Sequence, residues 1–390
     1  MRLVAFSDIH FCDTWKMVSL DDIVRVHERL TSYCTEHQPD LVLFLGDRFR
    51  ARQPKDHVRE AADRCLRNLS AAQARHGGVV AILVGNHDRP SESVGAGNTH
   101  SALRVFGDVL PNVTLMDEAK TYWLKTTRPP LGLMFPIHAL PTGFAFDRSR
   151  YDLNPGARAC ESILAFHGLL QGAVFDAAGR VETKSGISLA DIDDDAWDVV
   201  LGGDVHVPQR FDLKRTVGGY VGSTLRLKED DADDARGFLD VSWQKLPPMV
   251  PPNSTDAFKV VTPPTFTFVE GGGPLITKFD VTADDARRER VGHDGEVLIV
   301  TIKGPARVLR EISDAEIAAG FVGARQVVVK READEESPIL VDGIVATSTP
   351  FEDVVAYVKV SDRSGLDANR LIDKARESMA LPATRRGLFD

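Results

Sequence analysis

Five short motifs in the first 210 residues carry side chains that commonly bind metal ions. Together they offer carboxylates, imidazoles and one carboxamide. In chain order they contribute Asp8 and His10, then Asp47, then Asn86, His87 and Asp88, then His167, and finally Asp204 and His206. Mixed oxygen and imidazole ligands suit divalent cations, and a pair of such cations can activate water and clamp the oxygens around a reacting phosphorus. The chemistry that these residue types predict is metal-dependent hydrolysis.

One motif of this kind is weak support for a metal site, because a lone Asp-x-His or Gly-Asp after an apolar run is more often a solvated turn. Five in succession, each at the end of a strand-like run, rarely arise by chance. Ligands of open α/β sheets bind beyond the carboxyl ends of the strands, so we expect these loops to converge. Asp47 suits the role of a carboxylate that bridges two cations. Glycines precede three of the motifs and let the backbone turn sharply and approach the metals: Gly46, Gly85 and Gly203.

The apolar patterns predict a layered α/β architecture that positions these motifs. Strand-like runs such as "RLVAF" and "LVLFL" alternate with helical patterns near 20–36 and 55–75, as in a sheet with crossover helices. Ser19 is the expected N-cap of the first helix. Between 113 and 241 short strand-like runs dominate, which favours a layered sheet over a simple doubly wound one.

The last third of the chain has a different pattern. The proline-rich segment 246–264 indicates a domain boundary or an extended connection. Strand-like runs and one helix-like segment then predict a small α+β domain of about 70 residues. A charged stretch separates this domain from a tail in which apolar residues recur at helical spacing over 366–380.

Composition narrows the classes of protein that fit. The 390 residues suggest two or three domains, and the sequence has neither an apolar run long enough to span a bilayer nor a signal-like start, so we expect a cytoplasmic protein that does not enter membranes. Four cysteines without a CxxC pair make a disulfide framework or a thiolate zinc site improbable. The net charge of −10 argues against a protein that coats nucleic acid by itself, although a basic segment at 47–59 follows one of the metal motifs.

The order D-x-H, G-D, G-N-H-D, H and G-x-x-H over residues 1 to 240 resembles the calcineurin-like metallophosphoesterases. Within that superfamily, "LGGDVHVPQRF" and the following "GGYVGST" resemble the SbcD-type nuclease subunit of the DNA double-strand-break repair exonuclease. The narrower resemblance depends on Pro208, Gln209, Tyr220, Gly222 and Ser223. It implies a layered β-sandwich metallophosphoesterase core flanked by helices (1–265), a small α+β capping domain (266–335) and a C-terminal helical segment that docks a partner (336–390).

The resemblance also assigns roles to the motif residues. One divalent cation would be held by Asp8, His10, Asp47 and His206, and the other by Asp47, Asn86, His167 and Asp204. Mn²⁺ is the expected ion, with Mg²⁺ as the alternative. His87 would act as general acid or as transition-state stabiliser, with Asp88 fixing its ring, while an activated hydroxide attacks phosphorus in line with the departing oxygen.

Two positions depart from the family pattern. Asp204 stands where the family usually has histidine, which makes the second cation position harder and more negative and favours Mn²⁺ or Mg²⁺ over softer ions. Arg50 stands where the subfamily often has a phosphate-orienting histidine. It is either a clamp for a phosphate oxygen or an ordinary surface arginine.

The leading hypothesis is a metal-dependent DNA exonuclease or endonuclease subunit that works with an SbcC-type SMC-like ATPase. The resemblance implies that the C-terminal helix docks on this partner. The family commonly forms homodimers, and the sequence leaves the oligomeric state open. A stand-alone phosphodiesterase or phosphatase for small nucleotides is the second hypothesis, and a degenerate phosphoesterase scaffold that only binds partners is the third. His27, His37, His57 and His76 fall in helical patterns and are predicted to lie at the surface, whereas Tyr220 is predicted to pack in the interior.

Overall fold

In the computed structural model, the chain forms two compact units. The first comprises Met1–Asp280, Arg287–Thr301 and Asp314–Lys330, and the second comprises Val281–Ala286, Ile302–Ser313 and Arg331–Asp390. The residues that the structure describes are 1–15, 17–89, 103, 109–128, 132–143, 162–174, 187–192, 197–211, 213–214, 216–231, 235–246, 259–291 and 293–333. The tail helix predicted at 366–380 lies outside these residues.

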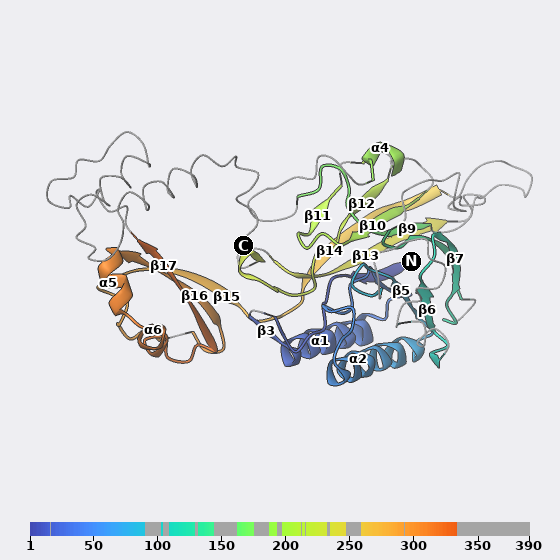
Figure 1. Ribbon diagram of the computed structural model, residues 1–390. Helices are drawn as coiled ribbons and strands as arrows, with labels where there is room; N and C mark the ends of the chain where they lie inside the picture. Colours follow the sequence, from blue (N-terminus) through green and yellow to red (C-terminus); the bar gives the residue numbers. More distant parts are fainter. Residues whose placement is uncertain are drawn as a thin grey trace, which may run out of the picture. The chain divides into compact units, whose positions relative to one another are not determined.

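A six-stranded sheet carries the first three metal motifs (Figure 1). Its strand order is β14-β13-β1-β4-β5-β6. The bounds are β1 Arg2–Phe6, β4 Leu41–Phe44, β5 Val79–Leu83, β6 Val113–Met116, β13 Gly237–Leu246 and β14 Lys259–Glu270. Strands β1, β4, β5 and β6 are parallel neighbours, whereas β13 and β14 are antiparallel additions at one edge. The carboxyl ends of β1, β4 and β5 therefore meet at one edge of the sheet.

A second six-stranded sheet carries the other two motifs. Its order is β11-β12-β10-β9-β8-β7, and β8, β9, β10 and β12 are parallel. The bounds are β7 Lys120–Lys125, β8 Met134–Leu140, β9 Ile163–His167, β10 Val199–Gly203, β11 Gln209–Arg210 and β12 Val217–Tyr220. In register, Gly203 of β10 pairs with His167 of β9, so both motifs of this sheet begin at the same level.

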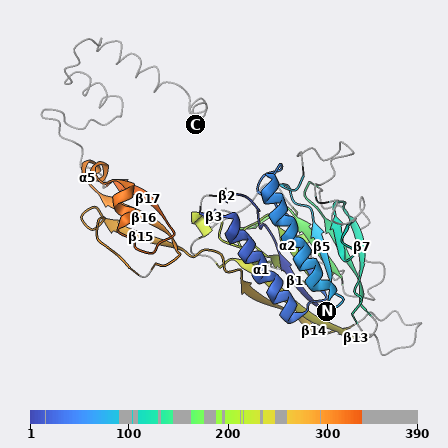
Figure 2. The same ribbon diagram turned by 90° about the horizontal axis from the view of Figure 1, so that it is seen from below.

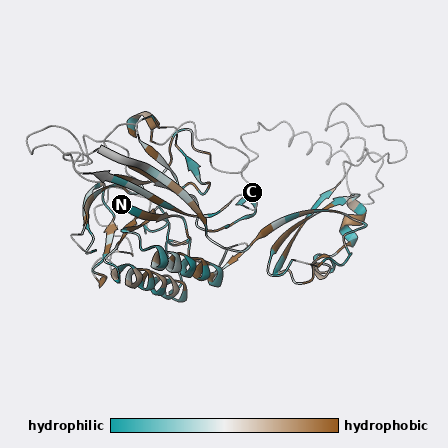
Figure 3. Ribbon diagram, turned by 180° about the vertical axis from the view of Figure 1, so that it is seen from behind, coloured by the Kyte–Doolittle hydropathy of each residue, from teal (hydrophilic) through white to brown (hydrophobic). Residues whose placement is uncertain are grey.

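Two helices cover the outer face of the first sheet, α1 (Leu20–His37) and α2 (Asp56–Ala74), and they lie side by side (Figure 2). Ser19 is the N-cap of α1 and forms a capping box with Asp22, as the sequence predicts. The colouring by hydropathy shows hydrophilic residues on the helices and hydrophobic stretches in the strands (Figure 3). The remaining short elements are β2 Thr14–Trp15, β3 Val18–Ser19, α4 Leu189–Ile192 and the 3₁₀ turn Glu229–Asp231.

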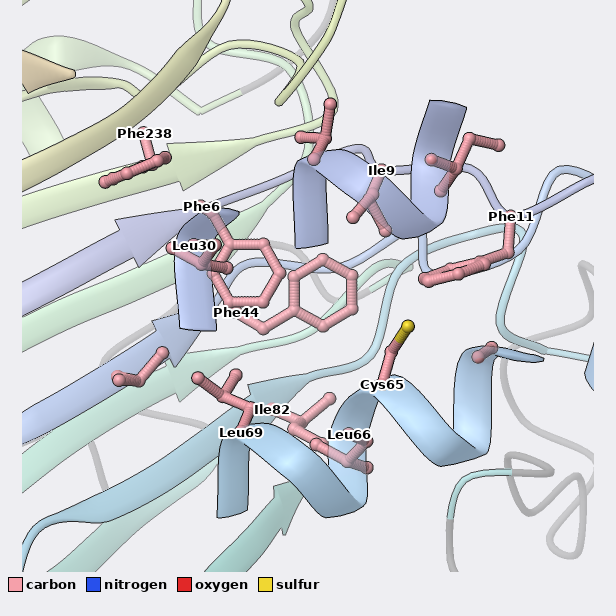
Figure 4. Close-up of a cluster of buried hydrophobic side chains, with 14 of the residues drawn as sticks. Phe6, Ile9, Phe11, Leu30, Phe44, Cys65, Leu66, Leu69, Ile82 and Phe238 are labelled. Carbon is pink, nitrogen blue, oxygen red and sulfur yellow. The ribbon is translucent and has the colours of Figure 1, made fainter. Parts of the chain in front are cut away.

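The strands alternate their side chains between two buried layers. Leu3 and Ala5 of β1 pack in the cluster between the sheets, whereas Val4 and Phe6 face α1 and α2. Phe6 stacks on Phe44 with ring centroids 4.6 Å apart, and this pair lies within the apolar cluster that α1 and α2 cover (Figure 4). Because both faces of the strands are buried, their sequences are nearly continuous apolar runs. The predicted layered α/β core is thus confirmed.

The chain after the core forms a three-stranded sheet in the order β15-β16-β17. Its elements are β15 Ile276–Thr282, β16 Val297–Gly304, α5 Ala306–Glu311, α6 Asp314–Ala319 and β17 Gln326–Ala333. Strand β14 pairs with β13 as far as Glu270, so the first sheet continues past the boundary predicted at 265. Among the described residues, no helix has both the length and the apolar character that crossing a membrane requires.

His27 corrects one sequence prediction, because it is buried in the core rather than exposed. Its side chain is 4% exposed and lies edge-on to Phe6, with ring centroids 6.0 Å apart. The helical spacing does indicate this burial, because residue 27 falls on the face of α1 that also carries Ile23 and Leu30. Burial lowers the pKa of His27 from 6.5 to about 3.

This shift predicts acid sensitivity. The unfolded chain takes up a proton on His27 below about pH 6.5, whereas the folded chain does not until about pH 3, so stability falls as the pH drops through this window. At about pH 4.5 the expected loss from this one group is roughly 2–3 kcal/mol. Urea unfolding of the wild type and of His27→Leu at about pH 7.5 and about pH 4.5 isolates it, because other titrating groups cancel in the difference. An equal pH dependence in both proteins would contradict the assignment.

Candidate metal centre

The carboxyl ends of five strands bring the predicted ligands together. Asp8 and His10 follow β1, Asp47 follows β4, Asn86 follows β5, His167 ends β9, and Asp204 and His206 follow β10. Three overlapping groups have ligand atoms that all lie within 4.8 Å of one another: Asp8, His10 and His206; His10, Asp47 and His87; Asp8, Asp47 and His167. The predicted convergence of the five motif-bearing loops is therefore observed.

The first donor group consists of Asp8, His10 and His206. The Nε2 atoms of the two histidines are 3.2 Å apart, and each lies 3.9 Å from Asp8 Oδ1. His10 Nδ1 lies 3.4 Å from the carbonyl oxygen of Phe49 and can donate to it, which leaves Nε2 with a lone pair. Asp8 Oδ1 is buried and has no hydrogen-bond partner among the described residues. An unpartnered carboxylate oxygen facing two imidazole nitrogens is the arrangement that a cation stabilises.

The second donor group consists of Asp47, Asn86, His167 and Asp204. His167 Nδ1 donates to the carbonyl oxygen of Leu45 at 2.6 Å, which fixes the tautomer with a lone pair on Nε2. That Nε2 lies 3.1 Å from Asn86 Oδ1, 3.4 Å from Asp47 Oδ1 and 3.8 Å from Asp204 Oδ1. The amide of Asn86 could rotate and donate to Asp47 and His167 instead. A cation among these acceptors would make the oxygen orientation favourable without rotation.

Asp47 lies between the two groups. Its Oδ2 is 3.8 Å from His10 Nε2, whereas its Oδ1 faces His167. The backbone amide of His87 donates to Oδ1 at 2.9 Å and holds the carboxylate in this orientation. One oxygen toward each group is the geometry that a bridging carboxylate requires.

The electrostatics of the cluster also favour binding of two divalent cations. Burial raises the pKa of Asp8 to about 8 and raises that of Asp47 well above its usual range, because the two carboxylates share a dry site. Burial also lowers the pKa of His206 to about 4 and lowers that of His10 well below its usual value. Neutral imidazoles and crowded carboxylates with mixed oxygen and nitrogen donors fit two divalent cations, whose charge would stabilise the ionised carboxylates.

The backbone at the ligands is held in an uncommon conformation. Asp8, His10, Asp47 and Asp204 have φ values of 49°, 50°, 58° and 90°. Of the described non-glycine residues, only these four and Gln38 have positive φ. Such conformations cost free energy and persist where the surrounding structure enforces them, which is common at functional sites.

Gly203 allows the two sheets to approach each other at the site. A Cβ at this position would lie 2.2 Å from the carbonyl oxygen of Leu45 and 2.4 Å from Ser7 Oγ. Gly203→Ala should therefore displace the carbonyl that orients His167, lower stability by about 1–3 kcal/mol and weaken Mn²⁺ binding by about tenfold or more. Calorimetric titration with Mn²⁺ measures the second effect. Gly168→Ala is the matched control, because no atom lies within 4 Å of its Cβ, and equal metal affinity in both variants would contradict this role.

His87 and Asp88 lie beside the donor groups. His87 Nε2 is 3.9 Å from Asp47 Oδ2. The carboxylate of Asp88 accepts from the backbone amides of Asp47, Arg48, Phe49 and Gly85 at 3.0, 2.9, 3.4 and 3.0 Å. Asp88 thus ties the loops after β4 and β5 together, and its role in orienting His87 stays a prediction.

The basic segment after Asp47 is less available than its sequence suggests. Arg48 is 3% exposed and lies 3.5 Å from Asp63, and Lys55 forms an ion pair with Asp13. Arg50 is exposed, and its guanidinium lies over the indole of Trp15, 4.4 Å from the ring centroid. Burial lowers the pKa values of His10 and His87, and the positive charge of Arg50 lowers both further, so it acts on the centre.

Two contributors to the site have no signal in the motifs. The carbonyl oxygen of Leu45, which fixes the tautomer of His167, is a backbone atom that the sequence does not reveal. Trp15 lies near two ligands, with its ring centroid 5.4 Å from that of His10 and 6.4 Å from that of His206. The only indication in the sequence is that Trp15 lies five residues after His10.

Tyr220, which was predicted to pack in the interior, is 1% exposed and donates to the carbonyl oxygen of Gly168.

Two donor groups that share one aspartate, at the carboxyl ends of strands from two packed sheets, form the ligand arrangement of hydrolases that act with two divalent metal ions. The chain belongs to the calcineurin-like phosphoesterase family, whose sequence profile matches residues 1–208. It is therefore a metal-dependent phosphoester hydrolase, and the predicted superfamily is confirmed.

Several solved structures were found by comparison with this chain. GAP50, "the anchor in the inner membrane complex of Plasmodium", is 11% identical, with a TM-score of 0.41 over 70% of this chain and 86% of that chain. The purple acid phosphatase PPD1 from yellow lupin seeds is 15% identical, with a TM-score of 0.38 over 62% of this chain and 49% of that chain. A dimetal phosphatase from Danio rerio is 11% identical, with a TM-score of 0.35 over 67% and 99%. No curated protein sequence matches significantly. Likenesses this distant say nothing about the substrate.

Proposed function

We propose that this protein is a nuclease that hydrolyses phosphodiester bonds in DNA with two Mn²⁺ ions, which Mg²⁺ can replace. The observation that carries the hydrolytic part is the pair of donor groups that share Asp47, with the ring of His87 beside the shared carboxylate at 3.9 Å. A phosphate group that bridges the two positions would meet His87 from within the site and Arg50 from the exposed side.

The DNA part is supported by the segment that carries the SbcD-type resemblance. Gln209 fixes this segment, because its Nε2 donates to the carbonyl oxygen of Val174 at 2.9 Å and its Oε1 accepts from the amide of Val174 at 3.0 Å. The amide of Ser223 donates to the carbonyl oxygen of the ligand His206 at 2.9 Å. The turn that resembles the nuclease subfamily thus supports a metal ligand directly.

The site residues have separate roles in the proposed mechanism. Bound divalent cations would polarise the phosphate and lower the pKa of water. Asp8, His10 and His206 would hold one cation, while Asn86, His167 and Asp204 would hold the other. Burial lowers the pKa of His87. Its ring would act as general acid or stabilise the developing negative charge by a hydrogen bond.

The partners follow the same proposal. An SbcC-type SMC-like ATPase would bind the C-terminal segment, and a homodimer would form through helices near the active-site face. The docking segment lies outside the described residues, so deletion of 340–390 tests it. Loss of ATPase binding with nuclease activity retained supports the assignment.

One observation favours a second candidate, a phosphodiesterase for small nucleotide substrates. Arg48 is buried and Lys55 is paired with Asp13. Fewer basic side chains are therefore available to hold a long phosphate backbone beside the metals. Such an enzyme would cleave small diesters, and added DNA would not inhibit this cleavage.

The deciding experiment compares substrates in one preparation. Purified protein is incubated with labelled duplex DNA, single-stranded DNA and bis(p-nitrophenyl) phosphate, in Mn²⁺, Mg²⁺ or EDTA. The proposal expects Mn²⁺-dependent cleavage of DNA that EDTA and His87→Ala abolish. Cleavage of the small diester alone would replace it with the second candidate, and no cleavage of any substrate would favour a degenerate scaffold.

A further inference from the structure

Trp15 lies at the rim of the metal centre, and no metal motif includes it. It belongs to the short ribbon of β2 and β3, where it pairs with Val18. The indole is half-buried against the core, with its ring roughly perpendicular to those of His10 and His206 at interplanar angles of 83° and 79°. Its position is therefore fixed by the interior on one side and by two metal ligands on another.

Arg50 lies on this indole and is attached to the centre by its backbone. Its amide donates to the carbonyl oxygen of Phe11 at 3.1 Å. Its guanidinium lies 4.4 Å from the indole centroid, which is within cation–π distance. Among the described residues, the neighbouring basic side chains pair with carboxylates, Arg48 with Asp63 and Lys55 with Asp13, whereas Arg50 forms no ion pair.

These contacts hold the guanidinium of Arg50 in place without an ion pair. A free arginine side chain loses considerable conformational freedom when it binds a ligand, and an aromatic platform that already restrains it reduces this loss. An unpaired, pre-positioned guanidinium beside two cation positions matches the fork geometry with which arginine recognises phosphate oxygens.

We propose that Trp15 is a positioning residue that holds the Arg50 guanidinium against the phosphate group of a phosphodiester substrate. This inference rests on the proposed function and deepens it, because it names the contact that increases affinity for the substrate phosphate. Trp15 touches neither the reacting atoms nor the cations. It acts through Arg50 alone.

The test is a double-mutant cycle on the Mn²⁺-loaded full-length protein with bis(p-nitrophenyl) phosphate. Trp15→Ala should raise KM about threefold to tenfold with little change in kcat, because the loss is that of a cation–π contact. Trp15→Phe keeps an aromatic face and should stay within about twofold of the wild type. In the Arg50→Ala background, Trp15→Ala should have no further effect. Trp123→Ala is the control, since Trp123 is 53% exposed on β7 and away from the ligands.

Two results would overturn the inference. One is an additive effect of Trp15→Ala in the Arg50→Ala background, which would show that the indole acts independently of the arginine. The other is weaker Mn²⁺ binding by Trp15→Ala in a calorimetric titration, which would make the residue a support for His10 or His206. Failure of the proposed function is distinguishable: a wild type that cleaves the small diester but not DNA refutes the nuclease assignment and leaves the cycle readable, whereas a wild type that hydrolyses neither refutes both.

Discussion

Asp47→Asn is expected to lower phosphodiester hydrolysis on the order of a thousandfold or more, because the bridging carboxylate positions both cations and balances their charge. The asparagine can still accept from the amide of His87, which donates to Asp47 Oδ1 at 2.9 Å, so the loop should keep its shape. Steady-state hydrolysis of bis(p-nitrophenyl) phosphate in saturating Mn²⁺ measures the loss.

Thermal unfolding separates this effect from misfolding. Burial raises the pKa of Asp47, so its ionised form destabilises the metal-free protein, and asparagine should leave the Tm of that form unchanged or higher. Mn²⁺ should raise the Tm of the wild type much more than that of the variant. Asp56→Asn is the matched control, since Asp56 is 95% exposed in the first turn of α2. Wild-type activity in Asp47→Asn would remove Asp47 from the bridging position.

Asp204→Ala is expected to abolish metal-dependent activity, whereas Asp204→His should keep it. Alanine removes the oxygen that lies 3.8 Å from His167 Nε2, while histidine restores the ligand usual in the family. The activity loss should be about a hundredfold or more, because one of two cations is lost or misplaced. The measurement is the diester rate together with the number of bound Mn²⁺ ions per chain, which should fall from two to one.

The backbone conformation provides the control for this substitution. Asp204 has a φ of 90°, which asparagine and histidine tolerate better than alanine does. Asp204→Asn keeps this tolerance and one oxygen ligand, so it should retain two cations with reduced affinity. If the alanine variant binds two Mn²⁺ ions and hydrolyses the diester at the wild-type rate, Asp204 is not a ligand.

The core was readable from the sequence because its pattern has one cause. Strands buried on both faces are apolar throughout, and helices packed on one face have an apolar stripe. The sequence therefore predicts β1, β4, β5 and α1 from their apolar patterns. The capping box at Ser19 is a local interaction between residues three apart, and it also needed no tertiary information.

The surroundings of the site were less readable. The motifs named the metal-capable side chains, but not the indole under Arg50 or the carbonyl that fixes His167. Arg48 belongs to the basic segment 47–59, but its side chain is buried against Asp63. A run of like charges does not show which members point outward, because that depends on the packing of the loop against α2.

The sequence alone determined which side chains can bind the metals and in which chain order they occur, because ligand chemistry is a property of residue types. Only the tertiary structure decided that Asp47 faces both donor groups, that Asp88 ties two loops together, and that Trp15 restrains Arg50. Those contacts join residues from different strands and loops, and their geometry is set by the packing of two sheets rather than by any local pattern.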